Sequence, residues 1–459
     1  MFGTSGIRGV VGDDVTAALA LAVGRAVASE GYDRVVVGRD ARASGDVLCD
    51  ALTAGLRECG TDVLEAGVAP TPTVARAVDW LEADAGVVVT ASHNPKTDNG
   101  IKLWSADGSA FDPDQCAAVS RRIETESYEV GGWDEYGSLE SAGDVLERHE
   151  SALLESVSLE DPPSVVVDVG NGTGAITARA LASAGCDVET LNGQQDGRFP
   201  GRPSEPTAET LSTLAALVET TDARLGIAHD GDADRMVAVD ETGSFVPKDV
   251  LLALFARRAA TDTDGACVAA PVDTSLAVDD ALEGVGASVT RTRVGDVFVA
   301  ERATRDDVVF GGEPSGAWIW PDEAMCPDGP LAACKLVEFV ADRGPLSSLV
   351  DGVETYPIQR TSIETDRKED VMDRVRDRVR ERYDEVDTLD GVYVDADDGW
   401  ILLRASGTEP LVRVTAEARS DTRARTLFED GVALVEDAAS SIGDSAGTPE
   451  VASTDGAAH

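Results

Sequence analysis

The chain has 459 residues and carries 39 lysines and arginines against 85 aspartates and glutamates, so its formal net charge at pH 7 is −46. Such a charge repels nucleic acid, and no apolar run approaches the ~18 residues that cross a bilayer, so we expect neither as a partner. The acidic residues are spread along the whole chain, which indicates a halophilic, cytoplasmic protein whose repulsion is screened by molar salt.

Residues 1–150 have the pattern of an α/β domain. Segments 17–29 and 45–57 are helical in pattern, and segment 34–37 between them reads as a strand. A βαβ order implies parallel strands with right-handed crossovers. Segment 38–42 follows this strand and lies near its carboxyl end, where ligands collect in α/β sheets.

A second buried strand, 86–89, ends in the loop Thr-Ala-Ser-His-Asn-Pro, residues 90–95. Pro95 prevents regular structure from continuing, so Ser92 should present an exposed hydroxyl at the ligand edge of the sheet. Ser92 is therefore a candidate nucleophile, although a serine in such a loop can also serve as a turn or cap residue. His93 is a further catalytic candidate, but adjacent side chains on an extended loop diverge, so it should not deprotonate Ser92 directly.

The domain predicted over 151–245 repeats the strand-to-helix pattern at 164–169 and 175–184. The turn between them has G-x-G-x-G spacing, which misses the dinucleotide-binding G-x-G-x-x-G and favours close strand-to-helix packing. A later strand, 225–228, leads into an acidic loop that contains Asp230, Asp232 and Asp234.

This acidic loop resembles an EF-hand, but Arg235 stands where the calcium loop needs glycine, and 236–239 reads as a strand. Three carboxylates with room for another oxygen suit Mg²⁺, which prefers few protein ligands plus a phosphate oxygen. We therefore expect a magnesium site at Asp230, Asp232 and Asp234.

A third domain is predicted over 246–352, with strands at 266–272 and 308–310 and a helix at 275–282. The loop 311–316 follows its last strand and carries Glu313 and Ser315. A carboxylate acceptor and a hydroxyl are groups that can bind sugar hydroxyls.

Segment 353–442 differs, with strands at 355–365, 400–404 and 411–418 and helices at 366–382 and 421–439, so it reads as α+β. The loop 404–410 is rich in small residues, whose free backbone N–H groups can ring an anion. A plain structural turn is the alternative. The residues expected to bind phosphate are Arg404, Ser406, Gly407, Thr408 and Arg413.

Residues 443–459 should be disordered, and seven scattered cysteines without C-x-x-C spacing favour free thiols.

Together with the segment Gly-Thr-Ser-Gly-Ile-Arg-Gly at 3–9, these loops resemble the motifs of the α-D-phosphohexomutase family, in the form of a haloarchaeal member. The family includes phosphoglucomutases, phosphomannomutases and phosphoglucosamine mutases. The resemblance implies three similar mixed-sheet α/β domains plus a smaller C-terminal α+β domain around a central cleft. It also implies that hexose 1-phosphate and hexose 6-phosphate are interconverted through a phosphoserine enzyme and a hexose 1,6-bisphosphate.

The resemblance also assigns roles to residues. Arg8 and Lys102 would lie beside the phosphorylated Ser92, which would bind Mg²⁺ with the three aspartates. The residues that would bind the substrate are Arg235, Glu313, Ser315, Arg404, Ser406, Gly407, Thr408 and Arg413. The chain departs from the pattern at Ala317, where many members have histidine, which leaves the general base open. The preferred hexose is open as well.

Two other functions are compatible with parts of the pattern. A metal-dependent serine phosphohydrolase acting on sugar phosphates would share the nucleophile and the metal, but would not need a separate phosphate cradle. An acidic calcium-binding protein would need the glycine that Arg235 replaces.

Overall fold

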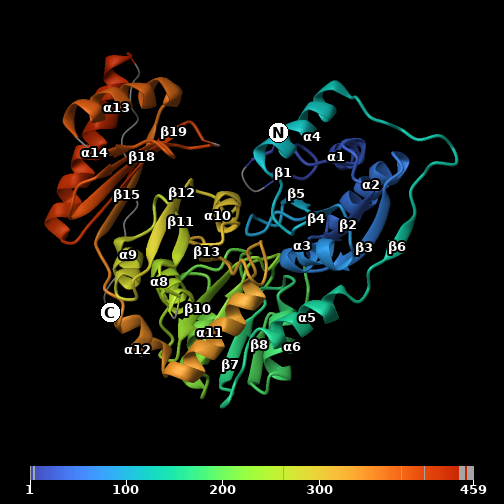
Figure 1. The fold of residues 1–459 in the computed structure, drawn as a ribbon, viewed down its shortest axis with the longest axis horizontal. Helices are drawn as coiled ribbons and strands as arrows, with labels where there is room; N and C mark the ends of the chain where they lie inside the picture. Colours follow the sequence, from blue (N-terminus) through green and yellow to red (C-terminus); the bar gives the residue numbers. More distant parts are fainter. Residues whose placement is uncertain are drawn as a thin grey trace.

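The computed structural model describes residues 2–3, 6–261, 263–383, 385–407, 409–443 and 450–451. Its strands form four sheets that follow one another along the chain. Figure 1 shows the N-terminal and C-terminal sheets on two separate arms, with the second and third sheets joining them below. No helix within these ranges is both long and apolar enough for a membrane span.

The first sheet has six strands, and its edge strand pairs with the strand that follows the serine loop. In spatial order the strands are β1 (Ile7–Val10), β5 (Asp98–Ser105), β4 (Ala85–Val89), β2 (Arg34–Arg39), β3 (Asp62–Val68) and β6 (Leu139–Ser141). From β4 to β6 the pairing is parallel, whereas β5 runs antiparallel to both β4 and β1. The sheet is therefore mixed, as predicted.

Helices cover both faces of this sheet because its strands are apolar on both faces. Val35 and Val37 pack toward α1 (Ala17–Ser29), α2 (Gly45–Glu58) and α4 (Pro113–Thr125). Val36 packs toward α3 (Thr71–Trp80) on the other face. Helix α1 begins at its predicted residue because the Thr16 hydroxyl accepts a hydrogen bond from the N–H of Leu19.

The second and third sheets have four strands each and share one hydrophobic core. The second contains β7 (Ser164–Asp168), β8 (Asp187–Leu191), β9 (Leu225–His229) and β10 (Met236–Asp240), with helices α5 (Val145–Glu155), α6 (Ala175–Ser183) and α7 (Ser212–Thr220). The third contains β11 (Cys267–Pro271), β12 (Ser288–Thr292), β13 (Val308–Glu313) and β14 (Ala317–Ile319), with helices α8 (Lys248–Ala260), α9 (Leu276–Glu283), α10 (Asp296–Ala303), α11 (Gly329–Arg343) and α12 (Leu346–Asp351).

One local arrangement recurs in all three α/β domains. A strand of the parallel set is followed by a loop and then by an antiparallel partner, in the pairs β4–β5, β9–β10 and β13–β14. The three loops are those predicted to carry the nucleophile, the metal ligands and the sugar-binding residues. Equivalent hairpins of three similar domains therefore hold these three loops.

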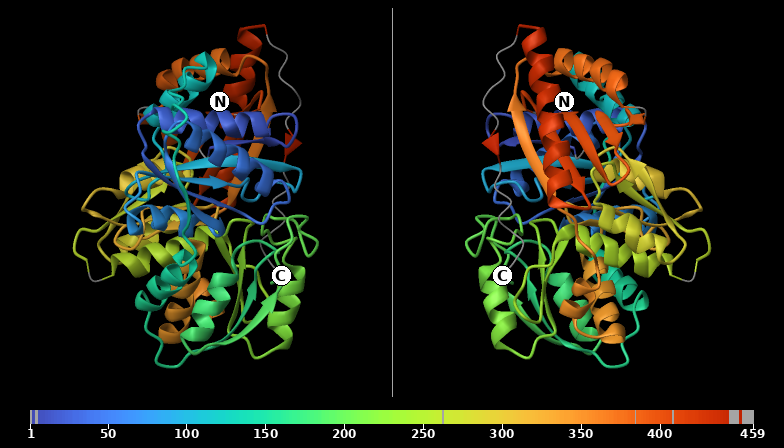
Figure 2. Two further views of the ribbon diagram at one scale, coloured as in Figure 1. Left: turned by 90° about the vertical axis from the view of Figure 1, so that its right-hand side faces the viewer. Right: turned by 90° about the vertical axis from the view of Figure 1, so that its left-hand side faces the viewer.

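The fourth sheet is antiparallel throughout, with the order β16 (Val386–Asp387), β17 (Val392–Asp395), β18 (Gly399–Ala405), β19 (Leu411–Ala418), β15 (Ile358–Glu364) and β20 (Glu450–Val451). Helices α13 (Lys368–Arg382) and α14 (Asp421–Ser441) pack on one face, and Figure 2 (right) shows α14 turned away from the N-terminal sheet. The α+β prediction is confirmed. Most of the predicted disordered tail, 444–449 and 452–459, lies outside the described residues, but Glu450–Val451 pairs with β15.

A buried carboxylate joins the fourth domain to the third. Glu417 on β19 accepts hydrogen bonds from the Ser275 hydroxyl at 2.6 Å and from the Leu276 N–H at 2.8 Å, at the start of α9. Its second oxygen also accepts from the Trp400 indole at 2.8 Å. Glu417 thus caps a helix of the neighbouring domain.

Candidate active site

Ser92 lies in the loop between β4 and β5, with its backbone in the left-handed region at φ 51°. Its N–H donates to the Thr90 hydroxyl at 2.9 Å. Our prediction that the Ser92 hydroxyl is exposed is wrong, because the residue is 0% exposed. The acidic loop of the second domain covers it, and the Ser92 Oγ donates to Asp230 Oδ2 at 2.5 Å.

His93 lies closer to Ser92 than the sequence indicated. Its Nδ1 is 3.3 Å from the Ser92 Oγ, because the left-handed backbone at Ser92 turns the two adjacent side chains together. Burial and the positive charges of Arg235, Arg8 and Lys102 lower the pKa of His93 to about 2. The imidazole is therefore neutral in this environment.

Asp230, Asp232 and Asp234 alternate through the turn between β9 and β10, and one carboxylate oxygen from each lies within 4.8 Å of the others. All three residues are buried. Among the described residues, Oδ1 of Asp232 and Oδ1 of Asp234 are buried without a hydrogen-bond partner. Unpaired buried carboxylate oxygens are unfavourable, and a hard divalent cation would satisfy them, so the residues fit Mg²⁺.

Lys102 supplies the local positive charge. Its Nζ lies 2.8 Å from Asp232 Oδ2 and also bonds to Asp234. Burial would raise the pKa of Asp232, but the Lys102 ammonium outweighs it and brings the pKa below its usual range. Burial and the negative charges of Asp234 and Asp232 raise the pKa of Asp230 well above its ordinary value. The single positive charge of Lys102 therefore does not neutralise the whole acidic cluster.

Arg8 lies on β1, where it pairs with Gly100 of β5. Its Nε is buried and lacks a hydrogen-bond partner within the described ranges. Arg8 lowers the pKa of both His93 and Asp232, so its charge acts on the same site. The structure therefore brings Arg8, Ser92 and Lys102 together, as the sequence suggested.

The loop between β13 and β14 is joined to the acidic loop through Arg235. Ser315 donates to Glu313 at 2.7 Å, and Ala317 forms a β-bridge with Arg235. Burial lowers the pKa of Arg235, but Asp234, Asp230 and Glu313 outweigh it and raise the pKa. The charge of Arg235 is thus felt by carboxylates of both loops.

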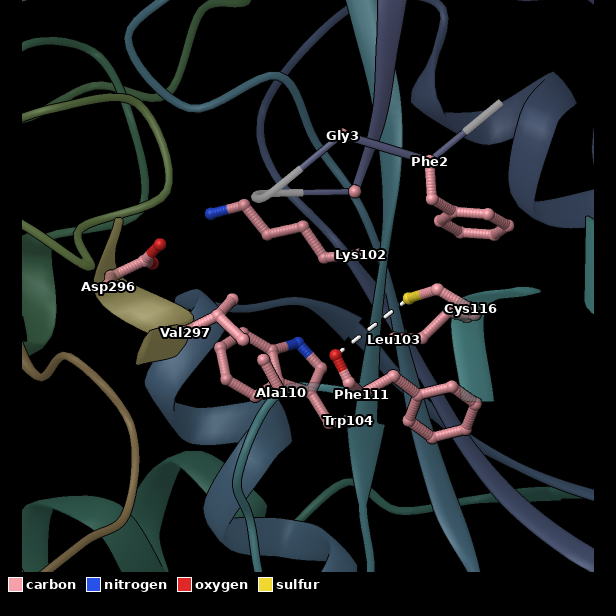
Figure 3. A pocket seen from close by; sticks show the side chains of 11 residues that line it. Phe2, Gly3, Lys102, Leu103, Trp104, Ala110, Phe111, Cys116, Asp296 and Val297 are labelled. Carbon is pink, nitrogen blue, oxygen red and sulfur yellow. Dashed lines mark hydrogen bonds between the residues drawn. The ribbon is translucent and has the colours of Figure 1, made fainter. Parts of the chain in front are cut away.

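A small cavity of about 30 Å³ separates β5 from the start of α10. Figure 3 shows Lys102 and Asp296 pointing toward one another at one end of it, beside the apolar side chains of Val297 and Trp104. Burial is the main cause of the raised pKa of Glu313, and the charge of Asp296 raises this pKa further. The third domain thus adds a carboxylate close to the first domain's lysine.

The predicted phosphate loop lies on the fourth domain, between β18 and β19. Arg404 and Arg413 are cross-strand partners there; Arg404 pairs with Asp390 at 3.5 Å, and Arg413 with Glu409 at 3.2 Å. Gly407 lines a cavity of about 730 Å³ whose other walls come from the first and third domains. Thr408 lies outside the described residues.

Some residues that build the site had no role in the sequence prediction. Thr71 donates to Asp232 at 2.5 Å, and Ser204 donates to the Ser92 carbonyl at 2.8 Å. Asp40 and Arg42 contact the serine loop. The only sequence signal for the last two was their place after a buried strand.

Four family models match the chain in order, and they describe phosphoglucomutase/phosphomannomutase alpha/beta/alpha domains I (residues 1–130), II (147–243) and III (247–356) and the C-terminal domain (361–434). The chain therefore belongs to the phosphoglucomutase/phosphomannomutase family. It is a sugar-phosphate mutase, an enzyme of the isomerase class, and not the phosphohydrolase that we kept as an alternative.

Relatives from archaea are similar over nearly their whole length. A probable phosphoglucosamine mutase of Methanopyrus kandleri is 46% identical over 440 residues, covering 95% of this chain and 97% of the relative. One of Methanothermobacter thermautotrophicus is 45% identical over 438 residues, covering 94% and 96%. A solved structure of a family protein from Burkholderia thailandensis has a TM-score of 0.87 at 30% identity, covering 97% and 100%.

More distant structures share the fold. The N-acetylphosphoglucosamine mutase of Aspergillus fumigatus, solved with GlcNAc-6P and magnesium, has a TM-score of 0.58 at 16% identity, covering 95% of both chains. A serine-to-alanine variant of that enzyme was also solved with glucose 1,6-bisphosphate, at a TM-score of 0.56 and 16% identity, covering 97% of this chain and 96% of that one.

Proposed function

We propose that this enzyme is a phosphoglucosamine mutase that interconverts glucosamine 6-phosphate and glucosamine 1-phosphate. The observation that carries the mechanism is the buried contact of 2.5 Å between the Ser92 hydroxyl and Asp230 of the acidic cluster. The choice of glucosamine is supported by the names of the archaeal relatives. Phosphoglucomutase or phosphomannomutase activity is the second candidate, supported by the family description.

In the proposed reaction Ser92 carries a phosphoryl group. The P–O bond to Ser92 Oγ breaks while a new P–O bond forms to the free hydroxyl of the hexose phosphate, and the proton of that hydroxyl replaces the phosphoryl group on the serine. The hexose 1,6-bisphosphate then turns around and returns its other phosphoryl group to Ser92. Arg8 and Lys102 stabilise the charge that develops during transfer.

Ser92, Asp230, Asp232 and Asp234 would hold Mg²⁺, and the two unpaired oxygens of Asp232 and Asp234 support this assignment. Bound there, the ion would neutralise charge on the transferring phosphoryl group. The Aspergillus complex with magnesium supports the same cofactor, and that with glucose 1,6-bisphosphate supports the same intermediate.

We further propose that each domain contributes one loop, within the boundaries 1–150, 151–245, 246–352 and 353–442. Arg235, Glu313 and Ser315 would bind sugar hydroxyls. The phosphate that is not being transferred would lie against Arg404, Ser406, Gly407, Thr408 and Arg413. The excess of acidic residues supports a halophilic enzyme that works in the cytoplasm.

A side-by-side assay tests this function. The purified protein is incubated with the 1-phosphates of glucosamine, glucose and mannose, with Mg²⁺, molar KCl and a trace of the matching 1,6-bisphosphate. We expect each 1-phosphate that binds to be converted to its 6-phosphate, with the highest kcat/KM for glucosamine 1-phosphate. A preference for glucose or mannose would reassign the substrate, and release of inorganic phosphate in place of isomerisation would overturn the mutase mechanism.

A further inference from the structure

Arg42, in the turn after β2, contacts the serine loop through both terminal nitrogens of its guanidinium. The residue is 1% exposed. One terminal nitrogen donates to the carbonyls of Ser92 and Asn94, both at 2.7 Å. The other donates to the carbonyls of Pro95 at 2.6 Å and Asp98 at 2.9 Å. Arg42 therefore binds three carbonyl groups of the loop that carries the proposed nucleophile and the carbonyl of the first residue of β5.

Asp40 and Thr90 close a ring of hydrogen bonds from this arginine to the serine. Asp40 Oδ2 accepts from Arg42 Nε at 3.0 Å and from the Thr90 hydroxyl at 2.7 Å. The Thr90 oxygen in turn accepts from the Ser92 N–H at 2.9 Å. The carbonyl of Ser92 is thus held by Arg42 directly, and its N–H is held through Thr90 by Asp40, the ion-pair partner of Arg42.

The second domain packs on the same arginine. The ring of Phe199 lies 5.1 Å from the Arg42 guanidinium, and the Ser204 hydroxyl donates to the Ser92 carbonyl at 2.8 Å. Gly197 passes so close that a Cβ there would lie 2.4 Å from the Ala41 carbonyl oxygen. The Ser92 carbonyl therefore accepts one hydrogen bond from the first domain, from Arg42, and one from the second domain, from Ser204.

We propose that Arg42 is a positioning residue for phosphoryl transfer, holding Ser92 in the left-handed conformation that directs its Oγ at the acidic cluster. This inference rests on the proposed function of Ser92. A non-glycine residue in that region is strained and persists only where its surroundings fix it. Phosphoryl transfer depends on placement of the nucleophile, and a displacement of about 1 Å can cost about a hundredfold in rate.

The first test is Arg42→Lys, because one ammonium keeps the charge but cannot reach four carbonyls. We expect kcat to fall about a hundredfold in both directions, with KM changed less than about threefold. The matched control is Arg76→Lys, since the Arg76 side chain is only 8% exposed but bonds to Asp328 and the Glu323 carbonyl. A kcat within threefold of wild type, or a loss equal to that of the control, would overturn the proposal.

A second variant serves if Arg42→Lys does not fold. Ser204→Ala removes only the second-domain donor to the Ser92 carbonyl, and we expect kcat to fall about tenfold at unchanged KM. Rapid-quench transfer from ³²P-labelled phosphoserine enzyme should slow by the same factor. Unchanged transfer would contradict the positioning role. Failure of wild-type protein to isomerise any hexose phosphate would instead refute the proposed function.

Discussion

Ser92 and Asp230 belong to different domains, yet the serine hydroxyl donates a 2.5 Å hydrogen bond to the aspartate. The serine loop and the acidic loop therefore come together only when the first two domains are docked. Phosphorylation of Ser92 would place a dianion against three carboxylates, so the site needs cations beyond Lys102 to operate.

Ser92→Ala should reduce turnover about a thousandfold or more, because the covalent carrier is lost. The fold should persist, since the change removes one hydrogen bond to a charged group, about 1.5–3 kcal/mol. Intact-mass spectrometry should detect a phosphate on wild type and on the control Ser151→Ala, whose serine is exposed on α5, but not on Ser92→Ala. Near-normal turnover of Ser92→Ala would contradict the assignment.

Asp232→Asn should raise the Mg²⁺ concentration needed for half-maximal activity by about tenfold or more. The change removes a charged ligand from the cluster and also weakens the contact with Lys102. Activity is titrated with Mg²⁺ after chelation, with the exposed Asp134→Asn as control. If the two variants need the same Mg²⁺ concentration, the metal binds elsewhere.

The melting temperature should rise with KCl up to molar concentrations, because a net charge of −46 repels itself over a longer distance in dilute salt. Calorimetry across KCl concentrations measures this. NaCl serves as a control for a specific effect of potassium. A melting temperature that is flat or falls with salt would reject the halophilic interpretation.

Arg413→Ala should weaken kcat/KM by roughly 1.5–3 kcal/mol with both the 1-phosphate and the 6-phosphate. Its ion pair with Glu409 is exposed, and such pairs stabilise little, so the guanidinium is available to a phosphate. Arg413→Lys should lose less than Arg413→Ala. The control Arg380→Ala, which changes an exposed arginine on α13, should keep the wild-type value. A loss in one direction alone would mean that Arg413 serves one binding pose.

Glu417→Gln should destabilise the enzyme by about 1–3 kcal/mol, because an amide oxygen cannot replace a carboxylate that accepts three hydrogen bonds. Since the contact joins the third and fourth domains, KM for both phosphates should rise more than kcat falls. Calorimetry and kinetics are compared with Glu429→Gln, an exposed site on α14. Equal stability of the two variants would refute the role of this contact.

Local patterns in the sequence predicted the strands and loops well, because apolar β-branched runs mark buried strands whatever their neighbours are. The run 225–228 became β9, and 411–418 became β19. The three aspartates and Ser92 were found because each follows such a strand.

The burial of Ser92 and its distance from His93 could not be predicted in this way. The first depends on a loop of another domain, and the second on one left-handed residue. Arg42 was missed because nothing local to it indicates four carbonyl partners more than 40 positions later in the chain. The antiparallel pairing of β5 with β1 likewise joins segments that are distant in sequence.

The hydrogen-bond ladder of β1, β5 and β4 has a consequence for the length of this segment. Lys102 pairs with Val88 and Arg8 with Gly100, so the ladder fixes both cations relative to Ser92. Side chains alternate along a strand, so deleting one residue between Gly100 and Lys102 would turn the lysine to the opposite face and present Leu103 to the aspartates. A substitution changes a single side chain, whereas a change in length turns every later side chain of β5 to the opposite face, so the pairing of β5 fixes the number of residues in this stretch.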